Sequence, residues 1–311
     1  NNPFGEDGRR LDPRYTARMD RLIRAADALG MIVIVSLFYP GQACRFQDDL
    51  AVVEAVQSGA RFIRDGGYTN VILEVANEHD LTAGCGRKHP QIVTVDGMVS
   101  LIGMAREIAG VPTGCSRRGG SVDPDICRAS DVLLIHGNGC TRQGLYQIIE
   151  QARAYAPGRP VVCNEDSQAI GNLDVAVRAG ASWGYYNNLT KQEPPANWGI
   201  TPGEDRFFAL RMARAAGIRI EDPPEREQFH LQGTEPDAYW QGRRWIRLAS
   251  LYPERIDHVM FYRGGKPAGL CHDEPFSLGY QTNWKQDAVL CGETETWSAD
   301  VHLCDGRVVR C

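Results

Sequence analysis

Two stretches of the sequence each end in an asparagine followed by a glutamate. VILEVANEHD, residues 71–80, places Asn77 before Glu78, and RPVVCNEDSQ, residues 159–168, places Asn164 before Glu165. In both stretches a short apolar, β-prone run stops abruptly at polar residues. This pattern is typical of a buried parallel strand whose carboxyl end opens onto a site. Two such strands would place two carboxylates at one end of a sheet.

Two carboxyl groups at one site can hold different protonation states. Close like charges raise the pKa of one of them, so that one carboxyl can protonate a leaving oxygen while the other, ionised, attacks or activates water. Asn77 and Asn164 carry neutral amides that can hold sugar hydroxyls or orient the acids. The residue types therefore fit acid–base and nucleophilic chemistry. Glu78 and Glu165 could also be solvated loop acids that follow two strands.

Apolar periodicity predicts alternating helices and strands over the first 218 residues. The predicted helices are 12–30, 48–67, 95–110, 141–158, 167–180 and 202–217, and the predicted strands are 31–39, 71–78, 111–115, 131–139, 161–166 and 181–188. Asp12 and Pro13 suit the start of the first helix and Gly30 suits its end. This alternation predicts an α/β fold with a parallel sheet covered by helices on both faces.

Six strands could form an open sheet or part of a barrel. No GxGxxG or Walker loop follows a strand in the sequence, so the usual nucleotide-binding reason for an open sheet is missing. Polar residues instead follow the strands: Tyr39, Gln42, Asn77, Glu78, His136, Asn138, Asn164, Glu165, Trp183 and Asn187. Such a ring of polar ends surrounds the mouth of an eight-stranded barrel. We therefore expect a (β/α)8 TIM barrel whose first two strands lie upstream of residue 1, which would leave the 31–39 strand without one neighbour.

The pattern changes at about residue 228, where helical periodicity stops. Short strands are predicted at 245–252, 258–265, 295–303 and 307–310, with hairpin-type turns at 264–265 and 305–306. We expect a barrel domain over 1–218, a linker over 219–227 and a small antiparallel β-sandwich over 228–311. The sandwich should pack on the barrel through a modest interface and carry no catalytic group.

Composition narrows the class of protein. The 311 residues are 43% hydrophobic and 23% charged, with a formal net charge of −5, which suits a large domain with a small one. No apolar run reaches the roughly 18 residues that span a bilayer. The mild negative charge argues against a nucleic-acid partner. Neither an initiator Met nor a signal peptide is visible, which suggests a processed end or a cut through a longer product.

The cysteines and histidines give no recognisable metal motif. Ten cysteines include no CxxC pair, so a structural zinc site is not expected. The cysteines can be free buried thiols, or the last four can include a disulfide. A second set matches no common ligand spacing, and we expect neither a metal nor a cofactor. This set is His79, Asp80, Cys85 and His89.

The order of the stretches resembles the clan A glycoside hydrolases, and within them the cellulase-like family 5 barrels, over about residues 3–218. The resemblance rests on PFGEDGRRLDPRY, AADALGMIVIVSLFYPGQ, NVILEVANE, PVVCNEDSQ and SWGYYNN. It implies that Glu78 is the acid/base and Glu165 the nucleophile of a retaining enzyme, with carboxyls roughly 5 to 5.5 Å apart. Residues 257–276 resemble bacterial immunoglobulin-like modules appended to carbohydrate enzymes.

The resemblance implies hydrolysis of O-glycosidic bonds in a β-linked oligosaccharide or polysaccharide by a secreted or periplasmic bacterial protein, and we expect a monomer. The expected substrate-binding residues are Tyr39, Gln42, Asn77, His136, Asn138, Asn164 and Trp183. His136 and Asn164 would hold the nucleophile and Trp183 would form the floor of the sugar site, although His136 and Trp183 can also be core residues. Two other functions stay open: a non-catalytic carbohydrate-binding or scaffold protein, and a metal-dependent barrel hydrolase.

Overall fold

The computed structural model describes residues 2–39, 43–81, 88–186, 199–279 and 288–311. The chain divides into two compact units. The first comprises Asn1–His136 and Gln147–Cys163, and the second comprises Gly137–Tyr146 and Asn164–Cys311. The predicted domain boundaries at 218 and 228 are not those of the two units, and they stay a prediction.

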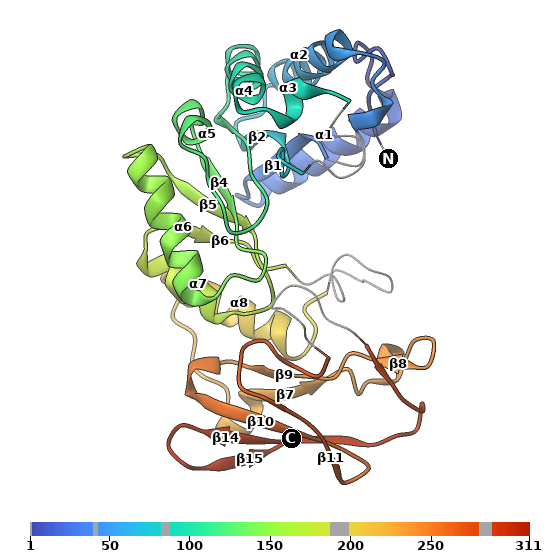
Figure 1. Cartoon of the computed structure of the whole chain (residues 1–311), viewed down its shortest axis with the longest axis vertical. Helices are drawn as coiled ribbons and strands as arrows, with labels where there is room; N and C mark the ends of the chain where they lie inside the picture. The colour runs from blue at the N-terminus through green and yellow to red at the C-terminus, as the bar shows by residue number, and fades with distance from the viewer. Residues whose placement is uncertain (1, 40–42, 82–87, 187–198, 280–287) are drawn as a thin grey trace. The chain divides into compact units, whose positions relative to one another are not determined.

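The first unit contains alternating helices and parallel strands (Figure 1). Its elements are α1 (Pro13–Ala28), β1 (Val33–Phe38), η1 (Ala43–Arg45), α2 (Asp49–Gly66), β2 (Val71–Ala76), α3 (Pro90–Val93), α4 (Val95–Ala109), β3 (Thr113–Gly114), α5 (Pro124–Ala129) and β4 (Leu133–His136). Helix α6 (Arg142–Tyr155) and strand β5 (Val161–Glu165) have residues in both units. Strands β1, β2 and β3 form one sheet in that order, and both strand pairs are parallel.

Local signals explain where the first helices begin and end. The Asp12 carboxylate accepts the amides of Arg14 and Tyr15 at the start of α1, and Pro13 occupies its first turn. Asp48 accepts the Ala51 amide at the start of α2, and Gly67 ends that helix in the left-handed region at φ 65°. These sequence-based helix predictions are confirmed. Within α1, Ile23 is fully buried, whereas Leu22 and Leu29 are exposed.

Strand β1 is an edge strand in the part of the chain that the structure describes, because its sheet runs β1-β2-β3. Beside it lies a hollow of about 310 Å³ lined by residues of β1 and α1 and by aromatic side chains such as Phe4 and Phe62. The expectation that the 31–39 strand lacks one neighbour agrees with this arrangement.

A second sheet contains β4, β5 and β6 (Ser182–Trp183) in that order. In the first unit the Leu133 amide donates to the Pro160 carbonyl at 2.9 Å, and in the second unit the Gly137 amide donates to the Glu165 carbonyl at 2.8 Å. Donor and acceptor numbers rise together, so β4 and β5 are parallel.

The predicted barrel is corrected on one point: among the described residues, β1 to β6 form two three-stranded sheets, β1-β2-β3 and β4-β5-β6, and no closed barrel. The predicted strand 111–115 shortens to Thr113–Gly114, since Pro112 has no amide to donate. The Asp131 amide still donates to the Thr113 carbonyl at 2.8 Å, which continues the strand order towards β4. Of the predicted strand 181–188, Ser182–Trp183 forms β6, and residues 187 and 188 lie outside the described residues.

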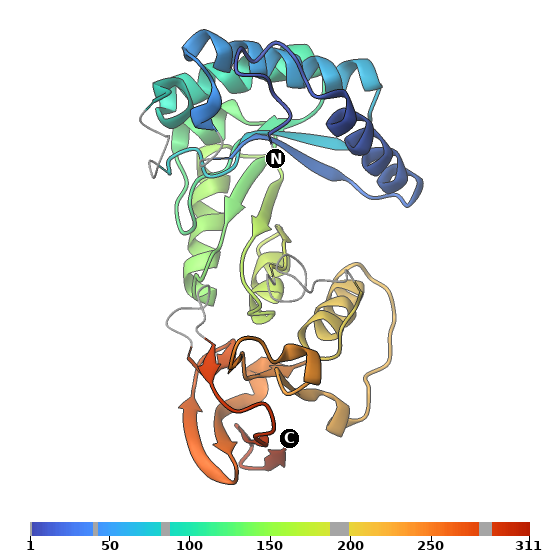
Figure 2. The same ribbon diagram turned by 90° about the vertical axis from the view of Figure 1, so that its right-hand side faces the viewer.

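Among its described residues, the second unit combines helices with antiparallel sheets (Figure 2). The helices are α7 (Gly171–Arg178) and α8 (Glu204–Ala215). The further elements are η3 (Glu225–Glu227), β7 (Phe229–Gln232), η4 (Pro236–Ala238), β8 (Arg243–Arg244), β9 (Arg247–Ser250), η5 (Pro253–Arg255), β10 (Ile256–Arg263), β11 (Lys266–Cys271), β12 (Phe276–Ser277), β13 (Val289–Leu290), β14 (Trp297–Leu303) and β15 (Val308–Arg310).

The antiparallel strands form a four-stranded sheet, β11-β10-β14-β15, and a three-stranded sheet, β12-β9-β7. Phe229 and Leu248 from the smaller sheet share one hydrophobic cluster with Val259, Phe261 and Val301 from the larger one. The predicted switch to strands is therefore confirmed. The immunoglobulin-like assignment stays a prediction.

Buried polar contacts join these sheets to α8 within the second unit. Arg247 of β9 and Glu204 of α8 form an ion pair at 2.8 Å, with side chains 3% and 6% exposed. Arg211 donates to the Leu251 carbonyl and to Glu254, each at 3.0 Å. The packing of the sheets on α8 therefore depends on matched charges as well as on apolar area.

The described cysteines include both a disulfide-bonded residue and free thiols. Cys44 is disulfide-bonded. The interpretation of a disulfide among the last four cysteines is wrong, because Cys271, Cys291, Cys304 and Cys311 are all free.

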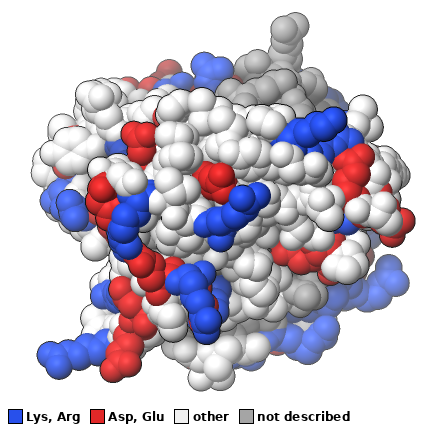
Figure 3. All heavy atoms as spheres, turned by 90° about the horizontal axis from the view of Figure 1, so that it is seen from below, with Lys and Arg blue, Asp and Glu red and all other residues white. Residues whose placement is uncertain are grey.

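Basic and acidic side chains are interspersed on the face drawn in Figure 3. Among the described helices, none combines the length and the apolar character that crossing a bilayer requires.

Candidate active site

Glu78 follows β2 in an unusual backbone conformation. Its φ is 47°, in the left-handed region that a glutamate occupies at a cost of roughly 1–2 kcal/mol. The Glu78 amide donates to the buried Ser116 hydroxyl at 3.0 Å, which helps to hold this conformation. Strained residues of this kind cluster at functional sites. The conformation of Glu78 therefore favours a functional role over that of a solvated loop acid.

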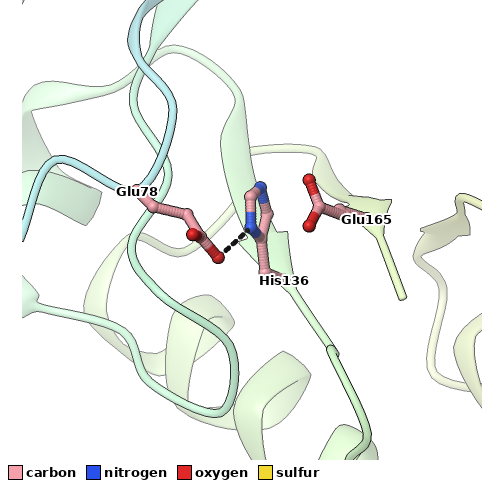
Figure 4. Close-up of side chains that lie close together, drawn as sticks. All are labelled: Glu78, His136 and Glu165. Atoms are coloured by element: carbon pink, nitrogen blue, oxygen red, sulfur yellow. Dashed lines mark hydrogen bonds and ion pairs between the residues drawn. The ribbon is translucent and has the colours of Figure 1, made fainter. Parts of the chain in front are cut away.

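The Glu78 carboxylate meets a histidine from another strand end. His136 is the last residue of β4 and is fully buried. Its Nδ1 lies 3.0 Å from Glu78 Oε1 (Figure 4), and the Glu78 side chain is 13% exposed. The sequence predicted that His136 would hold Glu165, whereas this hydrogen bond is made to Glu78. A histidine in this position can orient the carboxylate and exchange a proton with it.

Glu165, the other glutamate labelled in Figure 4, is the last residue of β5 and belongs to the second unit. Asn138 Nδ2 donates to Glu165 Oε1 at 3.1 Å. Asn138 also has a positive φ, 39°. The predicted site residue Asn138 is therefore next to the predicted nucleophile, where its neutral amide can orient the carboxylate without changing its charge.

Asp166 is a buried acid beside Glu165 that the sequence analysis did not single out. It is fully buried directly after Glu165, and its Oδ2 accepts from Trp183 Nε1 at 2.6 Å and from Asn172 Nδ2 at 2.9 Å. Burial raises the pKa of Asp166 to about 6, although hydrogen bonds from Trp183 and Asn172 oppose this shift. A Cβ on Gly137 would lie 2.4 Å from the Asp166 carboxyl, so the glycine leaves the space that this acid occupies. In the sequence, the position of Asp166 directly after Asn164 and Glu165 is the feature that could have pointed to it.

Trp183 is 3% exposed, which leaves little ring surface for a ligand. Its ring lies 5.9 Å from that of Phe208 and 6.3 Å from that of Tyr185. This burial fits the alternative that Trp183 is a packing residue better than the role of a sugar platform.

The other expected binding residues are spread over several positions. Tyr39 is 57% exposed after β1, and Asn77 lines the hollow beside that strand. Asn164 lies within β5, and its Oδ1 is buried without a hydrogen-bond partner among the described residues. Gln42 and Asn187 are outside the described residues. The structure brings His136 to Glu78 and Asn138 to Glu165.

The histidines near Glu78 have structural partners. His79 Nδ1 lies 3.2 Å from the Ile92 carbonyl, and His89 Nδ1 lies 3.2 Å from Asp49 Oδ1. Burial lowers the pKa of His79. Asp80 pairs with Arg117 at 3.1 Å. These three residues therefore serve local structure, and Cys85 is outside the described residues.

Comparison with known proteins gives a likeness of fold. No family model matches the chain, and no curated protein matches it. A candidate glycoside hydrolase from Bacteroides vulgatus superposes with a TM-score of 0.51 at 13% identity, over 97% of this chain and 62% of that one. A β-glucuronidase from Bacteroides uniformis gives a TM-score of 0.48 at 11% identity, over 94% of this chain and 40% of that one.

The chain thus spans less than two thirds of the length of either solved protein. At 13% identity and a TM-score of 0.51, the likeness to the Bacteroides vulgatus protein is one of fold alone. The structural neighbours are named as glycoside hydrolases and a β-glucuronidase, and the narrower resemblance to family 5 cellulases stays a prediction. What this chain shares with the Bacteroides vulgatus protein is the fold of a candidate glycoside hydrolase.

Proposed function

We propose that the chain carries the catalytic residues of a retaining glycoside hydrolase, with Glu78 as acid/base and Glu165 as nucleophile. The observation that carries the proposal is that each glutamate follows or ends a parallel strand and is held by its own polar neighbour. His136 lies 3.0 Å from Glu78, and Asn138 donates to Glu165 at 3.1 Å. The substrate would be a β-linked oligosaccharide or polysaccharide.

Glu78 must alternate between two protonation states in this mechanism. As an acid it gives a proton to the glycosidic oxygen, and as a base it later takes one from water. A largely buried carboxyl beside an imidazole is suited to both steps, since the imidazole Nδ1–H can donate to the ionised form. Because φ at Glu78 is positive, its side chain leaves the backbone in a different direction from that of a residue that continues strand β2.

Glu165 must stay ionised and oriented in order to attack the anomeric carbon. The Asn138 amide donates to Glu165 Oε1, and this hydrogen bond orients the carboxylate without changing its charge. The glycosyl ester formed on Glu165 would then be hydrolysed by water that Glu78 deprotonates. Two inversions give net retention of configuration.

The finer fold assignment belongs to the same proposal. Glu165 and His136 end adjacent parallel strands, as residues at one mouth of a (β/α)8 barrel would. The free edge of β1 is where a further strand of such a barrel would pair. We also propose a monomer in a secreted or periplasmic location, as suits a protein that acts on polysaccharides.

Variant kinetics test the proposal on activated aryl β-glycosides and on a panel of glycans. Glu165→Gln should abolish turnover of every substrate. Glu78→Gln should spare aryl glycosides with good leaving groups, which need little acid assistance. Glu107→Gln, at an exposed position on α4, is the matched control. Full turnover by the Glu165→Gln variant would refute the assignment of the nucleophile.

Binding and turnover measurements on the same protein samples distinguish two other functions from the proposed one. A non-catalytic carbohydrate-binding protein would bind oligosaccharides in calorimetry without turnover. A metal-dependent hydrolase is the second candidate because Glu78 and His136 of the first unit, with Oε1 and Nδ1 3.0 Å apart, carry donor groups that a divalent cation accepts. Loss of turnover on chelation and its recovery with added metal would favour that candidate.

A further inference from the structure

Three histidines lie in one row across the four-stranded sheet of the second unit. His258 of β10 and His302 of β14 are directly paired, and the pairing of Val259 with Cys271 places His272 opposite His258 on the other side. The His258 and His302 rings are stacked with centroids 4.1 Å apart, and the His272 ring lies 5.5 Å from that of His258. Register therefore brings together three imidazoles that are far apart in the sequence.

The row lies on the face of the sheet that is turned away from the hydrophobic core. The flanking residues Val259 and Val301 are fully buried in that core. Because side chains alternate along a strand, His258 and His302 point to the opposite face. The His258 side chain is 25% exposed. An ion in solution can therefore reach the row.

A carboxylate orients the central histidine. The register between β10 and β14 shifts between Ile256 and His258, so Asp257 is an extra residue at a bulge. Its Oδ2 lies 2.7 Å from His258 Nδ1. An ionised carboxylate accepts the Nδ1–H and so leaves the lone pair on Nε2. Metal-binding histidines are commonly held by a carboxylate in this way.

We propose that His258, His272 and His302 bind a divalent transition-metal ion of the Zn²⁺, Ni²⁺ or Cu²⁺ class, with Asp257 as the positioning residue. Imidazole nitrogens suit these ions, whereas Ca²⁺ and Mg²⁺ prefer oxygen ligands. With the His258 ring held by Asp257, rotation of the His272 and His302 side chains would bring their nitrogens towards the ion at His258 Nε2. The site is independent of the proposed glycosidase activity.

Calorimetry of the full chain with Ni²⁺ tests the proposal. A Cys304→Ser background removes an exposed thiol that could bind metal by itself. We expect one ion per chain, at least tenfold weaker binding after His258→Ala or His302→Ala, and about 10- to 100-fold weaker binding after Asp257→Asn. His230→Ala is the control, because this histidine lies on the other sheet and pairs with Glu235.

A spectroscopic readout separates ligation from a general loss of structure. The Cu²⁺-loaded protein should show hyperfine coupling to three nitrogens by electron paramagnetic resonance, and a His272→Ala variant should show one fewer. Circular dichroism of each variant confirms that the sheet is intact. The proposal is overturned if no ion binds at millimolar metal, if the His258→Ala and His302→Ala variants bind as well as the parent, or if His230→Ala weakens binding equally.

Discussion

Asp166 should make the stability of the protein depend on pH in a defined window. Its pKa is raised from the ordinary value of 3.8 to about 6 because the side chain is fully buried. A difference of about 2 pH units corresponds to about 3 kcal/mol at about 1.4 kcal/mol per unit. The folded state therefore holds this proton more tightly than the unfolded state does.

The sign follows from the number of protons bound. Between pH 3.8 and about 6 the folded protein retains a proton at Asp166 that the unfolded chain has lost. The free energy of unfolding therefore falls as the pH rises through this window. The cost is absent below pH 3.8 and complete above about pH 6.

Asp166→Asn removes this titration while keeping an acceptor in place. Trp183 and Asn172 both donate to Oδ2, a position that an amide oxygen can take. We expect the free energy of unfolding of the variant, relative to that of the parent, to rise by about 3 kcal/mol from pH 4 to pH 7. Urea unfolding followed by circular dichroism at intervals of one pH unit measures this difference. Asp65→Asn controls for the loss of an exposed carboxylate.

A difference between variant and parent that stays constant across this pH range would refute the reasoning. It would mean that Asp166 has the same proton affinity in the folded and unfolded states. A rise confined to pH values above 7 would contradict the position of the window.

Two other perturbations test separate parts of the structure. Arg247→Met removes the cation that pairs with the buried Glu204, so we expect urea unfolding to show a free energy of unfolding lower by about 3–5 kcal/mol. The Arg247→Met, Glu204→Gln double variant should lose less. A loss of less than about 1 kcal/mol in the single variant would show that the pair contributes little to stability. Asn138→Gly places a glycine at a positive φ, so the free energy of unfolding should rise by up to about 1 kcal/mol. Loss of the hydrogen bond to Glu165 should lower kcat. An unchanged kcat would show that Asn138 has no role in catalysis.

The sequence predicted the strands that carry the glutamates because their apolar runs are short and end sharply. VILEVA and VVCNE are the observed β2 and β5. Strands β3 and β6 are two residues long, shorter than predicted, because a strand extends only as far as its pairing with a neighbour, which the apolar pattern does not specify. In the C-terminal segment, strands β10 and β14 were predicted within two residues at each end.

Side-chain partners were harder to predict than strands. His136 and Glu78 are 58 residues apart, and no local pattern specifies their hydrogen bond. Asp166 is adjacent to Glu165 in the sequence, yet its burial depends on donors from two later elements. The histidine row likewise depends on strand register, which periodicity alone does not give.

Covalent trapping of the glycosyl intermediate tests the central claim most directly. The full chain would be incubated with an activated 2-deoxy-2-fluoro-β-glycoside of a sugar that it turns over, digested, and mapped by mass spectrometry. We predict one glycosyl adduct, on the peptide that contains Glu165, and its absence in the Glu165→Gln variant. An adduct on Glu78, or steady turnover with no adduct on any residue, would contradict the proposed mechanism.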